Sequence, residues 1–164
     1  MNSAVEIRTV AYEELDAFAK VIRDSFRDVA EEFGLTRENC PTHTSFLEAD
    51  RLRKEYENGY HMFGAYAGGT PVGYVGVKEI GDGAWELDHL AVLPAYRHHG
   101  VGRRLIDRCV SEVRQYDAVM MKIGIIEENT RLKDWYISYG FCHSGVARFP
   151  HLPFTVGFLA LEIQ

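Results

Sequence analysis

The chain has 164 residues, a length typical of one globular domain, and we expect a single domain over residues 1–164. Hydrophobic residues make up 46% and charged residues 26% of the chain, the ordinary balance of a soluble protein. A net charge of −6 argues against a nucleic-acid-binding surface. The sequence contains no run of about 18 apolar residues, so we expect no membrane span. The same charge suits a cationic acceptor such as an amine, or serves solubility alone.

The N-terminal sequence and the cysteines predict where the protein resides. Residues M-N-S-A-V-E-I-R-T-V lack the basic and apolar segments of a signal peptide. Cys40, Cys109 and Cys142 are odd in number and widely spaced, which fits reduced thiols better than a disulfide framework. We therefore expect a cytoplasmic location.

The order of predicted elements alternates between strands and helices, according to the spacing of apolar residues. In chain order we expect a strand at 5–10, a helix from about 13 to 33, a polar loop at 36–44, a helix from about 45 to 58, a hairpin of strands 60–67 and 72–80 turning at Gly68-Gly69, a strand at about 84–93, a helix from 101 to about 116, a strand at 119–126, a helix from 129 to about 139, and strands at 141–147 and 155–163.

The segment from Val92 to Gly102, V-L-P-A-Y-R-H-H-G-V-G, joins an apolar strand to an amphipathic helix. Glycines let main-chain N–H groups converge, and a helix N-terminus carries partial positive charge, so the segment suits a phosphate or diphosphate. A Rossmann site is disfavoured because its third glycine would fall at Leu105, and a P-loop because no Gly-Lys-Ser/Thr follows. The alternative is a tight turn that holds no ligand.

Two motifs together resemble the GCN5-related N-acetyltransferase (GNAT) family. Arg97 to Gly102 matches its glycine-turn motif, and Asn129 with Tyr136 to Phe141 matches its second motif, an Asn before a helix that ends in Tyr-x-x-x-Gly-Phe. The resemblance implies an α/β (α+β) fold whose central mixed, mostly antiparallel sheet splays at the fourth strand, flanked by about four helices. It also implies direct transfer of an acetyl group from acetyl-coenzyme A (acetyl-CoA) to a primary amine.

The resemblance further implies which residues bind acetyl-CoA. They are Leu90, Val92, Arg97, His98, His99, Gly100, Val101, Gly102, Arg103, Asn129 and Tyr136. The loop would act mostly through its backbone N–H groups. Asn129 is equally a good helix N-cap, and the side chains of Leu90 and Val92 are simply core.

Three residues are predicted to carry the chemistry. The resemblance implies that Val92 N–H stabilises the oxyanion and that Tyr136 protonates the leaving thiolate, although Tyr136 also suits a core position. The resemblance also makes Glu86, six residues before Val92, the candidate general base, because some family members carry their base at this offset; Asp88 is the second choice, and solvated strand carboxylates are the alternative. Without a bulge, strand alternation places Glu86, Asp88, Leu90 and Val92 on one face.

The acceptor side is less defined. The resemblance places His43 near the acceptor pocket, although a loop histidine also suits plain surface, and His151 could face the same pocket from the last hairpin. We expect no metal, because Cys40 and His43 form a single C-x-x-H pair. The expected partner is a small-molecule or peptide amine, with no nucleic acid or membrane, and a homodimer stays an open option. Other possibilities are a catalytically silent acetyl-CoA-binding sensor, transfer to oxygen, or a longer acyl donor.

Overall fold

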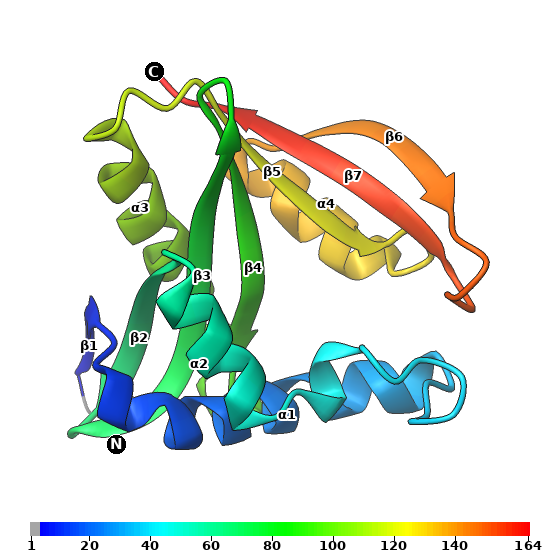
Figure 1. Cartoon of the computed structure of the whole chain (residues 1–164), viewed down its shortest axis with the longest axis horizontal. Helices are drawn as coiled ribbons and strands as arrows, with labels where there is room; N and C mark the ends of the chain where they lie inside the picture. The colour runs from blue at the N-terminus through cyan, green and yellow to red at the C-terminus, as the bar shows by residue number, and fades with distance from the viewer. Residues whose placement is uncertain (1–3) are drawn as a thin grey trace.

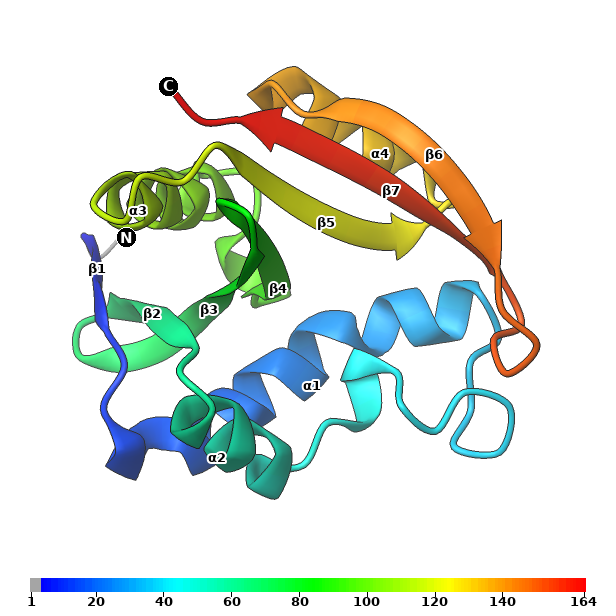
Figure 2. The ribbon, with the colours of Figure 1, turned by 45° about the horizontal axis from the view of Figure 1, so that its top comes forward.

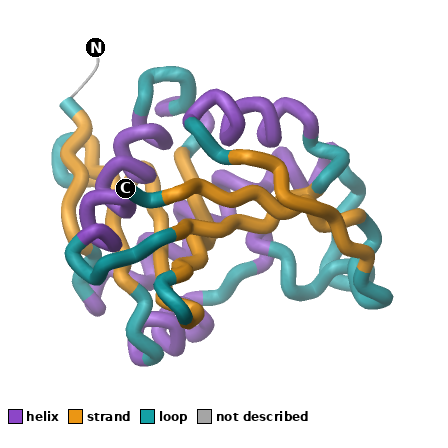
Figure 3. Tube along the Cα trace, turned by 90° about the horizontal axis from the view of Figure 1, so that it is seen from above, coloured by secondary structure: helices purple, strands orange, loops and turns teal. Residues whose placement is uncertain are grey.

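The computed structural model describes residues 4–164, which form one seven-stranded sheet with helices on both sides (Figure 1, Figure 3). The strands are β1 (Val5–Thr9), β2 (His61–Ala67), β3 (Thr70–Gly81), β4 (Ala84–Val92), β5 (Met120–Ile126), β6 (Cys142–Arg148) and β7 (Thr155–Glu162). The helices are α1 (Leu15–Glu32), α2 (Ala49–Glu57), α3 (Val101–Arg114) and α4 (Thr130–Tyr139). No helix within residues 4–164 is long and apolar enough to cross a bilayer.

The sheet is antiparallel throughout except at its centre. The strand order is β1-β2-β3-β4-β5-β7-β6, and only β4 and β5 run parallel. These two strands pair over three positions, the last joining Glu86 to Lys122. Beyond that pair the strands separate, as Figure 1 shows for the lower half of β4. The predicted mostly antiparallel sheet, splayed at its fourth strand, is therefore confirmed.

Two apolar clusters cover opposite faces of β2 to β4. On one face, α3 buries its predicted apolar stripe, including Leu105, Ile106 and Val113, against the sheet. On the other face, α1 packs Phe18 and Ile22 against the tyrosines of β2 and β3. Figure 2 shows α1 and α2 on the side of the sheet opposite α3. Apolar burial of this kind stabilises the fold by about 25 cal/mol per Å².

A β-bulge at His89 reverses the predicted alternation of β4. His89 has a φ of +56°, and the register jumps from the pair Gly76–Asp88 to the pair Tyr74–Ala91. The extra residue moves the later side chains to the other face. Leu90 and Val92 therefore pack on the α3 side with Leu87, whereas Asp88 lies on the α2 side. The prediction of one shared face was wrong because it assumed an unbroken strand.

The predicted helix at 45–58 is interrupted. A 3₁₀ turn at Thr44–Phe46 comes first, and α2 begins only at Ala49. Leu47 and Glu48 between them have extended backbones, with ψ values of 126° and 154°. Leu47 is buried in the apolar cluster that α1 forms with β2 and β3. This tertiary packing outweighs the local helical pattern of the sequence. The remaining elements agree with their predicted positions to within a few residues at either end.

Candidate active site

The glycine turn after β4 presents a run of free main-chain donors. His98 and Gly100 have φ values of +67° and +80°, which turn the chain sharply into α3. The N–H groups from His98 through Arg103 find no partner within residues 4–164, and the first bond into the helix is Arg104 N–H to the Gly100 carbonyl. Exposed N–H groups at a helix N-terminus form an anion site. This geometry supports the predicted phosphate-binding turn.

The Arg97 side chain joins the end of β4 to α1. Its guanidinium donates to the carbonyl oxygens of Val92 at 3.1 Å and Ser25 at 2.5 Å, and to Asp28 Oδ2 at 2.6 Å. Its N–H donates to the Pro94 carbonyl at 3.3 Å. Burial opposes ionisation of Asp28, but the Arg97 hydrogen bond and charge outweigh it and lower the pKa of that carboxyl. Arg97 thus ties the end of β4 to α1 and positions the glycine turn, and its predicted contact with the phosphates stays a prediction.

Gly102 allows α3 and α4 to approach closely. A Cβ atom there would lie 3.2 Å from two ring atoms of Trp135 and 3.9 Å from Val92 Cγ2. Sequence reasoning missed Trp135, although its place beside Tyr136 was a usable signal. Arg103 lies with its guanidinium carbon 4.9 Å from the Tyr139 ring centroid. The Tyr139 hydroxyl donates to Asp107 at 2.6 Å, so this residue packs and braces the two helices.

Val92 directs its N–H toward the gap left by β5. Leu93 N–H donates to the Val72 carbonyl of the neighbouring strand at 2.9 Å. In an antiparallel ladder successive residues point their amides to opposite sides, so Val92 N–H points away from β3. The Val92 carbonyl on that side accepts from Arg97. A free donor therefore faces the region where β4 and β5 have separated.

Tyr136 and Asn129 lie on α4 and at its start. Tyr136 is 5% exposed and packs edge-on against Trp135 and Phe141. Burial raises the pKa of its hydroxyl, which no described residue hydrogen-bonds. The same apolar cluster includes Leu90 and Val92 at its margin, so Tyr136 lies on the Val92 side of the sheet. Asn129 Oδ1 accepts from Leu132 N–H at 3.3 Å, which confirms its N-cap role.

The opposite face of β4 carries a carboxylate pair. The Tyr60 hydroxyl donates a hydrogen bond to Asp88 Oδ2, with the two oxygens 3.0 Å apart. Part of Glu86 is exposed, yet partial burial of its carboxyl and the charge of Asp88 raise its pKa to about 7. Deeper on this face, His89 Nε2 lies 3.1 Å from Glu55 Oε2. A carboxyl group with a pKa near neutrality is suited to accept a proton at physiological pH.

The two predicted acceptor histidines contact different aromatic side chains. His43 Nδ1 accepts from Ser45 N–H at 3.2 Å, and its ring packs against Phe26 and Phe46. His151 is exposed in the β6–β7 loop and contacts Phe149. Burial lowers the pKa of His43 to about 4, so its ring is neutral at pH 7. His43 therefore acts as a cap. No three His, Cys, Asp or Glu side chains converge as metal ligands within residues 4–164.

Replacing His43 by Ala should lower the free energy of unfolding by about 1 kcal/mol at pH 7, since an N-cap acceptor is lost. His43→Asn keeps a short acceptor and should recover part of that loss. Because the folded-state pKa is below the unfolded value, His43 contributes stability that disappears as pH falls from about 6.5 to about 4. Urea unfolding of both variants at several pH values measures this. Equal stability of His43→Ala and the wild type would contradict the capping role.

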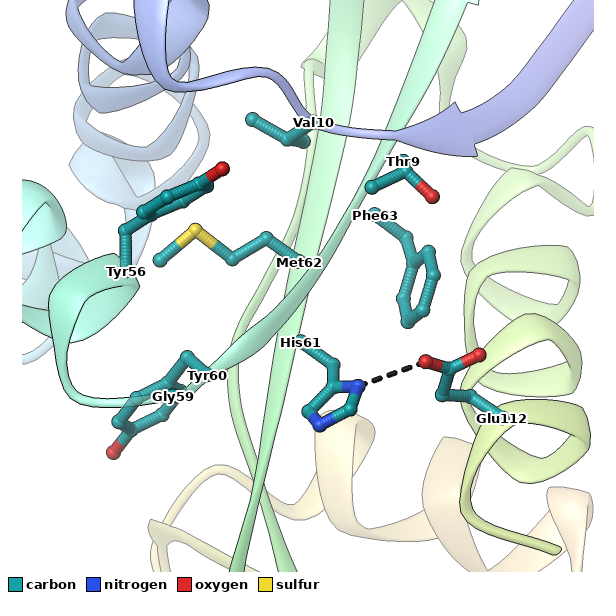
Figure 4. Close-up of a pocket in the computed structure, with 9 residues that line it drawn as sticks. All are labelled: Thr9, Val10, Tyr56, Gly59, Tyr60, His61, Met62, Phe63 and Glu112. Atoms are coloured by element: carbon teal, nitrogen blue, oxygen red, sulfur yellow. Dashed lines mark hydrogen bonds and ion pairs between the residues drawn. The ribbon is translucent and has the colours of Figure 1, made fainter. Parts of the chain in front are cut away.

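A hollow of about 230 Å³ lies elsewhere, where β1 ends beside β2 (Figure 4). Its lining includes Tyr56, Met62 and Phe63, and His61 Nδ1 lies 2.8 Å from Glu112 Oε2 at its edge. Apart from Tyr60, none of the groups described above lines it. The candidate active site is therefore the divergence of β4 and β5, where the free donors and the carboxylate pair lie on opposite faces.

Comparisons with known proteins agree with this geometry. The acetyltransferase (GNAT) family profile matches residues 21–141, well over half of the chain. An uncharacterized N-acetyltransferase encoded in the pepI 3′ region of Lactobacillus delbrueckii subsp. lactis is 24% identical, covering 94% of this chain and 91% of that protein. The N-alpha-acetyltransferase RimI of Mycobacterium tuberculosis is 32% identical, covering 54% and 56% of the two chains.

Solved structures share the whole fold. A PaiA N-acetyltransferase from Thermoplasma acidophilum in complex with coenzyme A superposes with a TM-score of 0.75 at 19% identity, covering 97% of this chain and 99% of that one. A ribosomal-protein-S18-alanine N-acetyltransferase from Escherichia coli gives 0.75 at 15% identity, covering 98% and 95%. With the family profile, these likenesses identify the chain as an N-acetyltransferase of the GNAT family.

Proposed function

We propose that the protein transfers an acetyl group directly from acetyl-CoA to a primary amine of a small molecule or peptide. One observation carries the proposal: the unpaired N–H groups from His98 through Arg103 lie beside a strand edge that β5 has left. The donor's diphosphate would take these N–H groups, and its thioester arm would follow the free edge of β4 toward Val92. The residues present therefore fit this substrate.

The two substrates would approach from opposite faces of β4. Val92 and Tyr136 lie on the α3 and α4 side, whereas Asp88 lies on the α2 side. The separation of β4 from β5 leaves an opening between the two faces. The amine could reach the thioester through it without first forming a covalent enzyme intermediate. Direct attack of the amine on the thioester is therefore the reaction that this arrangement supports.

The proposed chemistry follows from the charge states. An alkyl amine with a pKa of about 10.4 must lose a proton before it can attack, which costs roughly 5 kcal/mol at pH 7. Glu86 accepts that proton through water, a C–N bond forms, and Val92 N–H stabilises the oxyanion. The C–S bond then breaks, and Tyr136 gives its proton to the leaving thiolate. The nitrogen loses one more proton as the amide forms; that proton restores the Tyr136 hydroxyl through water, and Glu86 releases the first proton to solvent.

Named relatives support an amine acceptor. RimI of Mycobacterium tuberculosis is called an N-alpha-acetyltransferase, and the structure from Escherichia coli is of an S18-alanine N-acetyltransferase. An amino-acid acetyltransferase of Pseudomonas putida is 42% identical, covering 41% of this chain and 15% of that protein. The acceptors in these names are all amines. None of these names describes a sensor.

Tyr136→Phe tests the general acid. We expect turnover to fall roughly a hundredfold while the Kd for acetyl-CoA stays unchanged, since only the hydroxyl is removed. The buried ring keeps its packing against Trp135 and Phe141, so folding should be preserved. Stopped-flow release of coenzyme A thiol, with calorimetry for donor affinity, measures both quantities. Unchanged turnover would show that a group other than Tyr136 protonates the leaving thiolate.

A panel of amines tests the function itself. Purified protein with acetyl-CoA should release free coenzyme A thiol in the presence of at least one primary amine and form the matching amide by mass spectrometry. A catalytically silent binder would bind the donor yet form no amide with any amine. Donor binding and amide formation are measured separately, so the two functions are distinguished.

A further inference from the structure

We propose that His89 is a positioning residue for the oxyanion donor Val92, and that Glu55 on α2 holds His89 in place. The inference rests on the proposed function and adds two residues of this chain to it. Both residues act through the backbone of β4 and not through contact with the donor. The argument begins from the bulge in that strand.

The bulge decides to which side of β4 the Val92 N–H points. Leu93 N–H donates to the Val72 carbonyl of β3, so Val92 N–H points to the other side, toward the edge that β5 has left. If His89 and Leu90 paired in regular register with β3, every later residue would move by one position. Val92 would then take the place of Leu93 opposite Val72 and donate to β3. The proposed oxyanion donor is therefore free only while the bulge is kept.

The backbone of His89 is strained at this bulge. Its φ of +56° lies in the left-handed region, which residues other than glycine rarely adopt. The other described non-glycine residues with positive φ, Asp82, His98 and Asp117, lie in turns, whereas His89 lies inside a strand. A strained conformation of this kind persists only where the surrounding structure fixes it, and such residues gather at functional sites. The contacts of the His89 side chain supply that restraint.

A carboxylate on α2 holds the His89 side chain. His89 Nε2 lies 3.1 Å from Glu55 Oε2, and the two side chains are only 6% and 12% exposed. Arg51, one helical turn before Glu55, places its Nε 3.3 Å from the same oxygen and donates through Nη1 to the Thr42 carbonyl at 3.1 Å. Leu52 is fully buried in the apolar cluster that α1 forms with β2 and β3. The bulge is therefore attached to a helix that is itself fixed on two sides.

Stability alone does not account for a carboxylate at Glu55. Its Oε1 atom is buried and has no hydrogen-bond partner among residues 4–164. A buried acceptor without a partner destabilises a fold, and an ion pair removed from water often adds little net stability. The geometry that Glu55 imposes on His89 explains why a carboxylate occupies this costly position.

A second cluster of the same composition supplies a matched control. Glu112 on α3 pairs with Arg108, one helical turn before it, at 3.2 Å and with His61 on β2 at 2.8 Å. Like Glu55, it joins an arginine four residues earlier to a histidine on a strand. This cluster borders the hollow of Figure 4, which Val92 does not line. Removing the Glu112 carboxylate therefore deletes the same kinds of contact and leaves those of the bulge in place.

The test compares Glu55→Ala with Glu112→Ala by infrared difference spectroscopy of bound acetyl-CoA that carries carbon-13 at its thioester carbonyl. A hydrogen bond from Val92 N–H lowers the stretching frequency of that carbonyl, so Glu55→Ala should move the band to higher frequency than in the wild type. The same variant should lower kcat about tenfold, part of what a lost oxyanion donor costs, while the Kd for acetyl-CoA stays unchanged. Glu112→Ala should keep the wild-type band and kcat, even if it loses as much thermal stability. An unchanged band in Glu55→Ala, or equal shifts in both variants, would overturn the proposal.

Two further variants separate the restraint on His89 from the charge of Glu55. Glu55→Gln offers His89 both an acceptor and a donor, so it should recover most of the wild-type kcat and band position. His89→Asn keeps a residue that tolerates positive φ but has a side chain too short to reach Glu55. It should reproduce the shift of Glu55→Ala, and it decides the question if Glu55→Ala does not fold. Wild-type band and kcat in His89→Asn would contradict the positioning role.

This inference and the proposed function fail in different ways. If calorimetry detects no binding of acetyl-CoA to the folded wild type, both are overturned. If the donor binds and its carbonyl band is the same in the wild type, Glu55→Ala and His89→Asn, only the positioning role of His89 is overturned.

Discussion

Gly102→Glu should abolish acetyl-CoA binding at concentrations that saturate the wild type. The substitution places a carboxylate in the first turn of α3, among the N–H groups that the diphosphate would occupy. A unit charge about 4 Å from another at a protein surface costs about 4 kcal/mol, equivalent to roughly a thousandfold in affinity before salt screening. Isothermal titration calorimetry at two salt concentrations measures the loss and its screening.

Gly102→Gln is the matched control for this experiment. Both side chains press on Trp135, because any Cβ at this position lies 3.2 Å from its indole ring. The neutral variant should therefore reproduce the steric cost without the charge. If the two variants lose the same affinity, the clash with Trp135 explains the effect. Retained binding in Gly102→Glu would place the phosphates elsewhere.

Glu86→Gln should lower turnover about a hundredfold and remove the acidic limb of the pH profile. Only the ionised carboxylate can accept a proton, and its pKa is raised to about 7 by partial burial and by Asp88, with His89 opposing. Wild-type kcat/KM should therefore rise as pH increases through about 7 and level off above it, because this parameter follows the ionisation of the free enzyme. Rates measured from pH 5.5 to 9 test this, with Glu79→Gln, at an exposed position on β3, as the control.

The same pKa predicts an opposite trend in stability. The folded-state pKa of Glu86 exceeds its unfolded value of 4.5, so the folded state retains the proton longer. Stability contributed by that proton is present below pH 4.5 and is lost as pH rises toward about 7. Glu86→Gln should thus unfold at a higher temperature than the wild type at pH 8, and at a similar temperature at pH 4. A wild-type advantage at pH 8 would show that the ionised carboxylate stabilises the fold.

Several features were predictable because their causes are local. The amphipathic stripe of α3 needs only its own periodic residues, and the Gly68-Gly69 turn needs two positive φ values, which glycine adopts freely. The glycine turn before α3 combines both causes, so its free N–H groups followed from the sequence alone. Asn129 formed its expected N-cap for the same reason.

Other features depended on partners far along the chain. The bulge at His89 exists only in the register between β3 and β4, and it separates Asp88 from Val92 onto opposite faces. Arg97 finds Asp28 at a separation of 69 residues. Tyr60 and Tyr74 reach the Asp88 region only after β2 and β3 pair.

The sequence alone therefore determined the order of elements and the glycine turn before α3, since these follow from periodicity and from the backbone freedom of neighbouring residues. The tertiary structure decided which side chains share a face and which charges are neutralised. Strand register and long-range contacts depend on the packing of the whole sheet. A short stretch of sequence does not specify that packing, so these features could not be predicted from it.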